Sequence, residues 1–233
     1  MIWTAIAVLF AFLWVFAFYR EDRRREPLVY VALAFGFGML AMGGASLLEA
    51  WVLTCPFLGQ YEERLIPRVT LFVGMIGPIE EVCKFLPIWL LFYPRRFFDE
   101  AEDGLIYGAA VATGFAFAEN LKFFHDGTWP VEIMLYRSPG GPFVHILFAA
   151  YWGTALGWAT LEAARRDRRN IILAGLAWAA LMHGLFNLVT YSAKELTVQG
   201  VRGGMLGILI FSFLAIRWHL YRMKRETRVA TKG

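Results

Sequence analysis

Three charged residues within five positions, in the middle of an apolar run, constrain this chain more than any other feature. Glu80, Glu81 and Lys84 lie in the segment Gly77-Pro78-Ile79-Glu80-Glu81-Val82-Cys83-Lys84, which is apolar on both sides. At the centre of a membrane helix, each charged side chain costs roughly 2.5–3.5 kcal/mol of insertion free energy. Ionisable groups inside a membrane segment therefore indicate a functional site.

This apolar run is one of several that are long enough to cross a bilayer. Hydrophobic residues make up 58% of the chain and charged residues only 18%, and a spanning helix needs about 17–25 apolar residues. The sequence predicts an all-α polytopic membrane protein, a single domain over residues 1–233 with a polar site inside the helix bundle. Seven transmembrane helices are predicted, at residues 2–19, 28–53, 69–93, 104–121, 143–161, 171–191 and 201–218.

The distribution of positive charge predicts the orientation of these helices. With the N-terminus outside, the cytoplasmic connections and the C-terminal tail hold 16 of the 23 Lys and Arg residues, and the outer connections hold 6. Positive residues concentrate on the cytoplasmic side of membrane proteins, so an N-out, C-in topology is predicted. The net charge of +4 then reflects topology and contact of the basic tail with anionic lipid, and no nucleic-acid partner is expected.

Helical spacing relates the charged residues around position 80 to one another. Glu80 and Lys84 are four residues apart and share one face, whereas Glu81 is displaced from Glu80 by about 100°. Pro78 and Pro87 bracket the charged residues. Each proline removes a backbone hydrogen bond and can kink the helix.

Other polar residues inside the predicted spans are expected at a similar depth. His183 and Asn187 share a face well inside the sixth helix, while Glu119 and His145 lie nearer the outer ends of the fourth and fifth. For Glu119 and His145, a position at the headgroup boundary is an equal alternative to a place in a site. Glu49, near the outer end of the second helix, is expected to pack at the interface and is assigned no role.

Two kinds of water activation fit this set of side chains. In one, His145, His183 and one or two carboxylates bind a divalent metal such as zinc, and a remaining glutamate acts as general base. In the other, a desolvated glutamate activates water directly while histidine and asparagine stabilise the oxyanion. Both lead to hydrolysis of a carbonyl compound, most simply a peptide bond, with Lys84 neutralising excess negative charge. The sequence has no H-E-x-x-H motif, nucleophile elbow or phosphate-binding loop.

The ordered motifs resemble those of the PrsW family of bacterial intramembrane proteases, which are related to the CAAX prenyl proteases. Glu80-Glu81-Val82-Cys83-Lys84 is similar to EExxK, residues 115–120 to FxxxEN, and residues 183–187 to HxxxN, with the His145 segment between the last two. The resemblance implies an integral membrane protease of a bacterial or archaeal cytoplasmic membrane. It also implies a single-pass membrane protein as substrate, such as an anti-sigma factor, cleaved near the extracytoplasmic face.

Taken with the chemistry above, the resemblance assigns two groups of residues. The predicted catalytic residues are Glu80, Glu81, Lys84 and Asn187, and the predicted metal ligands are Glu119, His145 and His183. Whether a metal or a glutamate alone activates the water stays open at this point.

Two other functions remain as alternatives. Buried Glu, Lys and His also form proton relays in transporters, and a non-catalytic membrane scaffold could retain such a cluster. Glycine pairs at Gly104/Gly108 and Gly153/Gly157, and the glycines of the second helix at positions 36, 38, 43 and 44, are expected to allow close helix packing. The sequence makes no prediction of oligomeric state.

Overall fold

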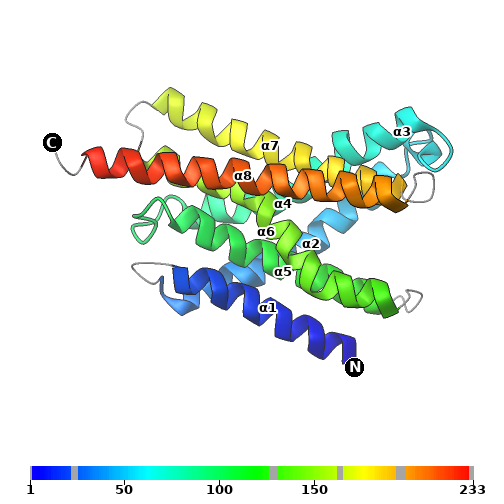
Figure 1. Cartoon of the computed structure of the whole chain (residues 1–233), viewed down its shortest axis with the longest axis horizontal. Coiled ribbons are helices and arrows are strands. Elements are labelled where there is room, and N and C mark those ends of the chain that lie inside the picture. Colours follow the sequence, from blue (N-terminus) through cyan, green and yellow to red (C-terminus); the bar gives the residue numbers. More distant parts are fainter. Residues whose placement is uncertain (1, 22–25, 126–130, 162–164, 193–197, 231–233) are drawn as a thin grey trace.

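All regular structure in the described part of the chain is helical, which confirms the all-α class. The computed structural model describes residues 2–21, 26–125, 131–161, 165–192 and 198–230. Its long helices run side by side along one axis, and α1 begins at the end opposite to the one where α8 ends (Figure 1). The elements are α1 (Ile2–Glu21), α2 (Leu28–Val52), η1 (Leu58–Gln60), α3 (Leu65–Val69), η2 (Thr70–Ile76), α4 (Gly77–Pro87), η3 (Ile88–Phe92), α5 (Asp103–His125), α6 (Val131–Leu161), α7 (Arg165–Tyr191) and α8 (Val198–Ala230).

Each predicted span coincides with a helix or a continuous helical run, but two helices extend well beyond it. α6 begins at Val131, twelve residues before the predicted start, and α8 continues from the predicted end at 218 to Ala230. The predicted start of α6 is wrong, since the helix continues through Pro139 and Pro142. Prolines are tolerated inside membrane helices. Near them, α1 is joined to α6 by a hydrogen bond that Trp14 Nε1 donates to the Pro139 carbonyl oxygen at 3.0 Å.

Apolar surface covers much of the outside of the bundle. Large apolar side chains on α1, α2 and α8 are well exposed, among them Phe12 (74%), Leu47 (76%) and Leu214 (60%). Within the described residues, Leu28–Val52 and Asp167–Tyr191 are long and apolar enough to cross a membrane, and Thr4–Ala17 is a shorter apolar stretch. Seven spans and their orientation stay predictions.

α5 lies at the centre of the bundle and packs against α1, α2, α4 and α6. Nearly all of its residues from Gly104 to Ala116 are buried. Glycine permits the closest crossings. A Cβ atom at Gly114 would lie 2.0 Å from the Phe35 carbonyl oxygen of α2, and one at Gly104 would lie 2.1 Å from the Gly153 carbonyl oxygen of α6. The glycines of α5 make it a less certain membrane span in sequence, and the same residues let the neighbouring helices approach closely.

The glycine predictions are therefore confirmed in part. Added Cβ atoms at Gly104 and Gly153 would clash with backbone across the α5–α6 contact, and one at Gly157 would clash with the Ala101 backbone just before α5. One at Gly108 would make only ordinary contacts, with the Trp152 ring at 3.5 Å and the Ala149 carbonyl oxygen at 3.7 Å. On α2 only Gly38 is at a close crossing. Added Cβ atoms at positions 36, 43 and 44 meet nothing within 4 Å in the described structure, so the prediction for those three is wrong.

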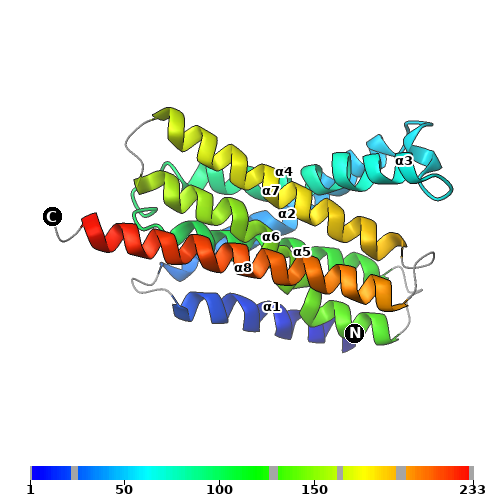
Figure 2. The ribbon, with the colours of Figure 1, turned by 45° about the horizontal axis from the view of Figure 1, so that its top comes forward.

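The segment that carries the charged triplet is one continuous helical run with two wider turns. α3, η2, α4 and η3 follow one another from Leu65 to Phe92, and η2 and η3 are π-helical. Pro78 is in the first turn of α4 and Pro87 is its last residue, so each proline lies at a change between α and π geometry. A missing N–H donor favours such a change of hydrogen-bond register. α3 projects at the end of the bundle opposite to the end of α8 (Figure 2).

Candidate active site

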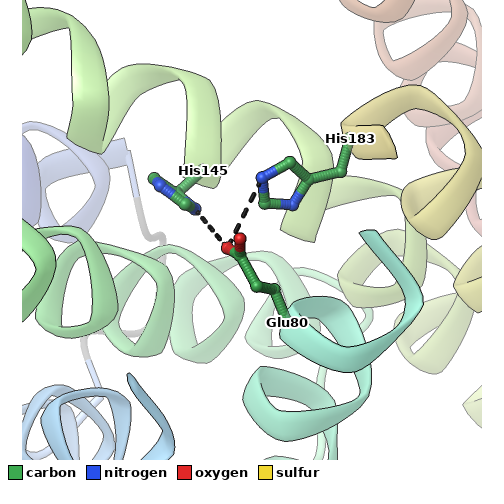
Figure 3. A group of neighbouring side chains, drawn as sticks. All are labelled: Glu80, His145 and His183. Atoms are coloured by element: carbon green, nitrogen blue, oxygen red, sulfur yellow. Dashed lines mark ion pairs between the residues drawn. The ribbon is translucent and has the colours of Figure 1, made fainter. Parts of the chain in front are cut away.

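Three side chains from three helices converge in the interior of the bundle. Glu80 comes from α4, His145 from α6 and His183 from α7, and the three are 6%, 6% and 2% exposed. Glu80 Oε2 lies 3.5 Å from His183 Nε2 and 3.9 Å from His145 Nδ1 (Figure 3). One nitrogen or oxygen atom from each residue lies within 4.8 Å of the other two.

The hydrogen-bond partner of His183 defines its tautomer. His183 Nδ1 lies 2.7 Å from Glu81 Oε1. A carboxylate only accepts hydrogen bonds, so Nδ1 carries the proton and Nε2 presents a lone pair towards Glu80. A histidine that donates to a carboxylate with one nitrogen and offers the other is the usual arrangement of a metal-binding histidine.

His145 is arranged in the same way by different partners. Its Nε2 lies 3.0 Å from Glu119 Oε2, and its Nδ1 lies 3.0 Å from Lys84 Nζ. The Lys84 ammonium can only donate, so Nδ1 is the acceptor and the proton is on Nε2, where it is donated to Glu119. His145 Nδ1 therefore faces the interior of the group with its lone pair engaged by Lys84, and a metal ion bound there would replace this hydrogen bond.

Three acceptor atoms thus face one another, and one of them, His145 Nδ1, already accepts from Lys84. Glu80 Oε2 is buried and has no hydrogen-bond partner among the described residues, and a buried carboxylate oxygen without a partner is costly. Lys84 Nζ, at 3.8 Å from that oxygen, is too distant for a hydrogen bond. One carboxylate and two imidazole nitrogens are a ligand set that zinc and similar divalent ions bind. The residues present therefore fit a metal site.

Glu81 and Glu119 differ from Glu80 because both of their oxygens already have partners. Glu81 Oε1 accepts from Lys84 Nζ at 2.6 Å as well as from His183, and Glu81 Oε2 accepts from Trp152 Nε1 at 3.0 Å. Glu119 Oε1 pairs with Arg137 Nη2 at 2.7 Å. These two carboxylates are fixed behind the histidines, whereas Glu80 faces the space between them.

The structure brings six of the seven predicted site residues into one network of contacts. These six are Glu80, Glu81, Lys84, Glu119, His145 and His183. Asn187 is half-buried one turn beyond His183 and forms no side-chain hydrogen bond with any residue that the structure describes. Which of these residues act as ligands and which as catalytic groups stays a prediction.

Sequence reasoning missed two members of the network, Trp152 and Arg137. Trp152 is fully buried and donates to Glu81, but one of nine tryptophans in a membrane protein carries no signal of its own. Arg137 falls in the predicted outer connection between residues 121 and 143. In the structure it belongs to α6, which brings its side chain beside Glu119. Glu49, which the sequence left without a role, interacts electrostatically with Glu119 and Lys122.

A bundle of apolar helices that buries a Glu/His/His group, with a carboxylate behind each histidine, defines a membrane-embedded hydrolase of the metal-dependent type. Residues 26–216 match the model of the PrsW family intramembrane metalloproteases. The chain therefore belongs to this family and is an intramembrane protease.

Curated relatives agree with this assignment over most of their length. The chain is 27% identical to protease PrsW of Oceanobacillus iheyensis over 209 residues, which are 89% of this chain and 87% of the relative. It is 26% identical to protease PrsW of Clostridioides difficile, with 95% of this chain and 87% of the relative covered. For protease PrsW of Geobacillus kaustophilus the identity is 27%, with 91% and 85% covered. No solved structure matches the chain.

Proposed function

We propose that this protease uses a zinc ion held by Glu80, His145 and His183 to hydrolyse a peptide bond of a single-pass membrane protein. The cleavage site is placed near the extracytoplasmic face of a bacterial cytoplasmic membrane. One observation supports the metal assignment: three buried acceptor atoms face one another, and Glu80 Oε2 has no hydrogen-bond donor among the described residues.

Each residue of the network has a defined part in this proposal. A bound zinc ion supplies a Lewis acid that polarises the scissile carbonyl and acidifies a water molecule. Glu81 and Glu119 hold the two histidines in the tautomers that direct Nε2 of His183 and Nδ1 of His145 inward. Lys84 neutralises Glu81 at 2.6 Å, and Asn187, which has no other partner among the described residues, donates to the substrate carbonyl.

This assignment exchanges two residues of the sequence-based prediction. The sequence placed Glu119 among the ligands and Glu80 among the catalytic groups. We favour Glu80 as the ligand because both oxygens of Glu119 already bind Arg137 and His145. Glu119 and Glu81 could bind a metal only by giving up an existing partner, so Glu80 is the carboxylate available as a ligand.

Exposure supports access from the predicted extracytoplasmic end. The side chains of Glu119 and Arg137 are 22% and 26% exposed, whereas those of Glu81 and Lys84 are fully buried. Glu119 lies near the end of α5 and Arg137 near the start of α6, and both of these ends are predicted to be outside. A peptide segment just outside the membrane span of a substrate, as in an anti-sigma factor, could reach the site from there.

Metal analysis of the purified protein tests the ligand set. We expect close to one zinc per chain in the wild type and loss of zinc in Glu80→Gln and His183→Ala. The matched control is Glu63→Gln, which removes the same charge from an exposed position. Zinc that is retained in Glu80→Gln, together with lost hydrolysis, would make Glu80 the general base. A metal-free wild type would contradict the metal assignment.

Mass spectrometry of new protein N-termini tests the substrate class. Membranes of cells that produce the wild type are compared with membranes of cells that produce Glu80→Gln. We expect new N-termini immediately outside the apolar segment of single-pass proteins in the wild-type sample only. Cleavage confined to soluble proteins, or to the cytoplasmic side, would contradict the proposed substrate and face.

A further inference from the structure

We propose that Arg137 is a positioning residue that acts through Glu119 to hold His145 in the orientation and tautomer a metal needs. The proposal deepens the proposed metal site and rests on it. Arg137 touches neither the three converging atoms nor the space between them, so its effect must pass through its partner. The chain of contacts runs from Arg137 to Glu119 and from Glu119 to His145.

The carboxylate of Glu119 is divided between two donors. Its Oε1 lies 2.7 Å from Arg137 Nη2, and its Oε2 lies 3.0 Å from His145 Nε2. With the guanidinium in place, the carboxylate is held in one rotation. Without it, Glu119 would be a partly exposed carboxylate that is free to rotate, and His145 Nε2 would lose a defined acceptor.

Two helices make this arrangement rigid. Arg137 and His145 both belong to α6 and are eight residues apart, about 12 Å along a helix axis. Glu119 reaches both of them from α5. The carboxylate therefore bridges two points on the neighbouring helix, and the α5–α6 contact holds the residues behind His145 in register.

The guanidinium is itself fixed. Its central carbon lies 3.6 Å from the centre of the Phe123 ring, which is within the range of a cation–π contact. Asn120 Nδ2 donates to the Arg137 carbonyl oxygen at 3.5 Å. Surface ion pairs alone contribute little, but in this pair the guanidinium is stacked on an aromatic ring and the carboxylate is bonded to a site histidine.

The surroundings of His183 support this role for Arg137. Glu81 lies behind His183 as Glu119 lies behind His145, and Glu81 is fixed by Lys84 and Trp152. Each histidine thus has a carboxylate, and each carboxylate has donors of its own. Arg137 donates to the carboxylate behind His145, as Lys84 and Trp152 donate to the carboxylate behind His183. Arg137 differs from these two residues because its side chain is partly exposed, near the end of the bundle that is predicted to be outside.

The test compares Co²⁺ binding by wild type, Arg137→Gln and Arg137→Lys, with Arg202→Gln as the matched control on an exposed arginine of α8. Outer partners of metal ligands typically contribute roughly 10–100-fold to metal affinity. We expect Arg137→Gln to bind Co²⁺ about tenfold more weakly and to show shifted visible absorption bands, with unchanged thermal stability of the metal-free protein. Arg137→Lys keeps the charge and should restore part of the affinity. Wild-type affinity and spectrum in Arg137→Gln would overturn the proposal.

A second readout does not need a bound metal and separates the two proposals. Diethyl pyrocarbonate modifies imidazole nitrogens, and mass spectrometry reports the rate at His145. We expect faster modification in Arg137→Gln than in wild type and Arg202→Gln, because the Nε2 hydrogen bond is no longer fixed. A wild type that binds no Co²⁺ contradicts the proposed metal site, and an unchanged rate at His145 then contradicts the role of Arg137 as well.

Discussion

At the scale of single residues, the site depends on how hydrogen-bond donors are shared among three glutamates. Glu81 receives donors from Lys84, His183 and Trp152, and Glu119 receives them from Arg137 and His145. Glu80 Oε2 receives none from the residues that the structure describes. Three carboxylates that look alike in sequence therefore have different surroundings, and the donors around each one are the basis of the roles proposed for them.

The hydrogen bond from Trp152 to Glu81 gives a first prediction at this scale. Trp152→Phe removes the indole N–H and keeps most of the ring volume, so Glu81 Oε2 becomes a buried acceptor without a donor. We expect metal affinity to fall on the order of tenfold, measured by competition with a chelator. Trp178→Phe is the control, since Trp178 is 48% exposed and lies outside the network. Equal effects of the two substitutions would contradict the role of Trp152.

The buried ammonium gives a second prediction. Lys84→Met keeps a long side chain but removes the cation 2.6 Å from Glu81. Breaking a buried ion pair from one side typically costs about 3–5 kcal/mol, so we expect a clear loss of stability in denaturant unfolding of the detergent-solubilised protein. The control Lys122→Met removes an exposed ammonium that contacts Ser46 at 3.4 Å and should change stability little. A similarly small effect of Lys84→Met would contradict the prediction.

At the scale of elements, α5 decides how closely the helices around the site can pack. Its contact with α2 uses Gly114 and Gly38, where a Cβ atom would lie 2.0 Å from a backbone carbonyl oxygen of the other helix. Its contact with α6 positions Glu119 against Arg137 and His145. A change in the α2–α5 spacing would therefore shift Glu119 relative to Arg137 and His145.

Two glycine-to-alanine substitutions are expected to differ in their effect on the free energy of unfolding. Gly114→Ala forces α5 away from α2, and we expect a loss of about 1–3 kcal/mol, as for other overpacked sites. Gly36→Ala adds a methyl group where nothing lies within 4 Å, and the gain in helix propensity should leave stability equal or higher by up to about 1 kcal/mol. Unfolding of both variants in the same detergent measures the difference. Equal stability would indicate that α2 and α5 are not in close contact.

At the scale of the whole molecule, the two cysteines test the predicted topology. Cys55 is exposed after the end of α2, and Cys83 is half-buried in α4. A membrane-impermeant maleimide applied to intact cells should label Cys55 and leave Cys83 unlabelled. A cysteine introduced as Asp167→Cys in a Cys55→Ser background, at an exposed position near the start of α7, should react only after permeabilisation. The reverse pattern would contradict the N-out, C-in orientation.

Sequence alone predicted the helical class and singled out six of the ionisable residues that meet, with Glu119 and His145 left open, because inside an apolar helix each such residue is an exception that needs a partner. It could not assign partners. Whether Glu80 or Glu119 faces the two histidines depends on the rotation of α4 and α5, and that rotation depends on packing. Arg137 was missed because it falls in the connection between the predicted helices 104–121 and 143–161, which in the structure is partly the start of α6.

The two π-helical segments have a consequence for the phase of the helix that carries the charged triplet. A π turn holds more residues than an α turn, so η2 and η3 act as small insertions on either side of α4. Removing one residue from η2 would restore an uninterrupted α-helix. Glu80, Glu81 and Lys84 would keep their mutual spacing, but they would point about 100° away from His145 and His183. A single-residue deletion that restores α geometry in η2 would thus separate Glu80 from both histidines.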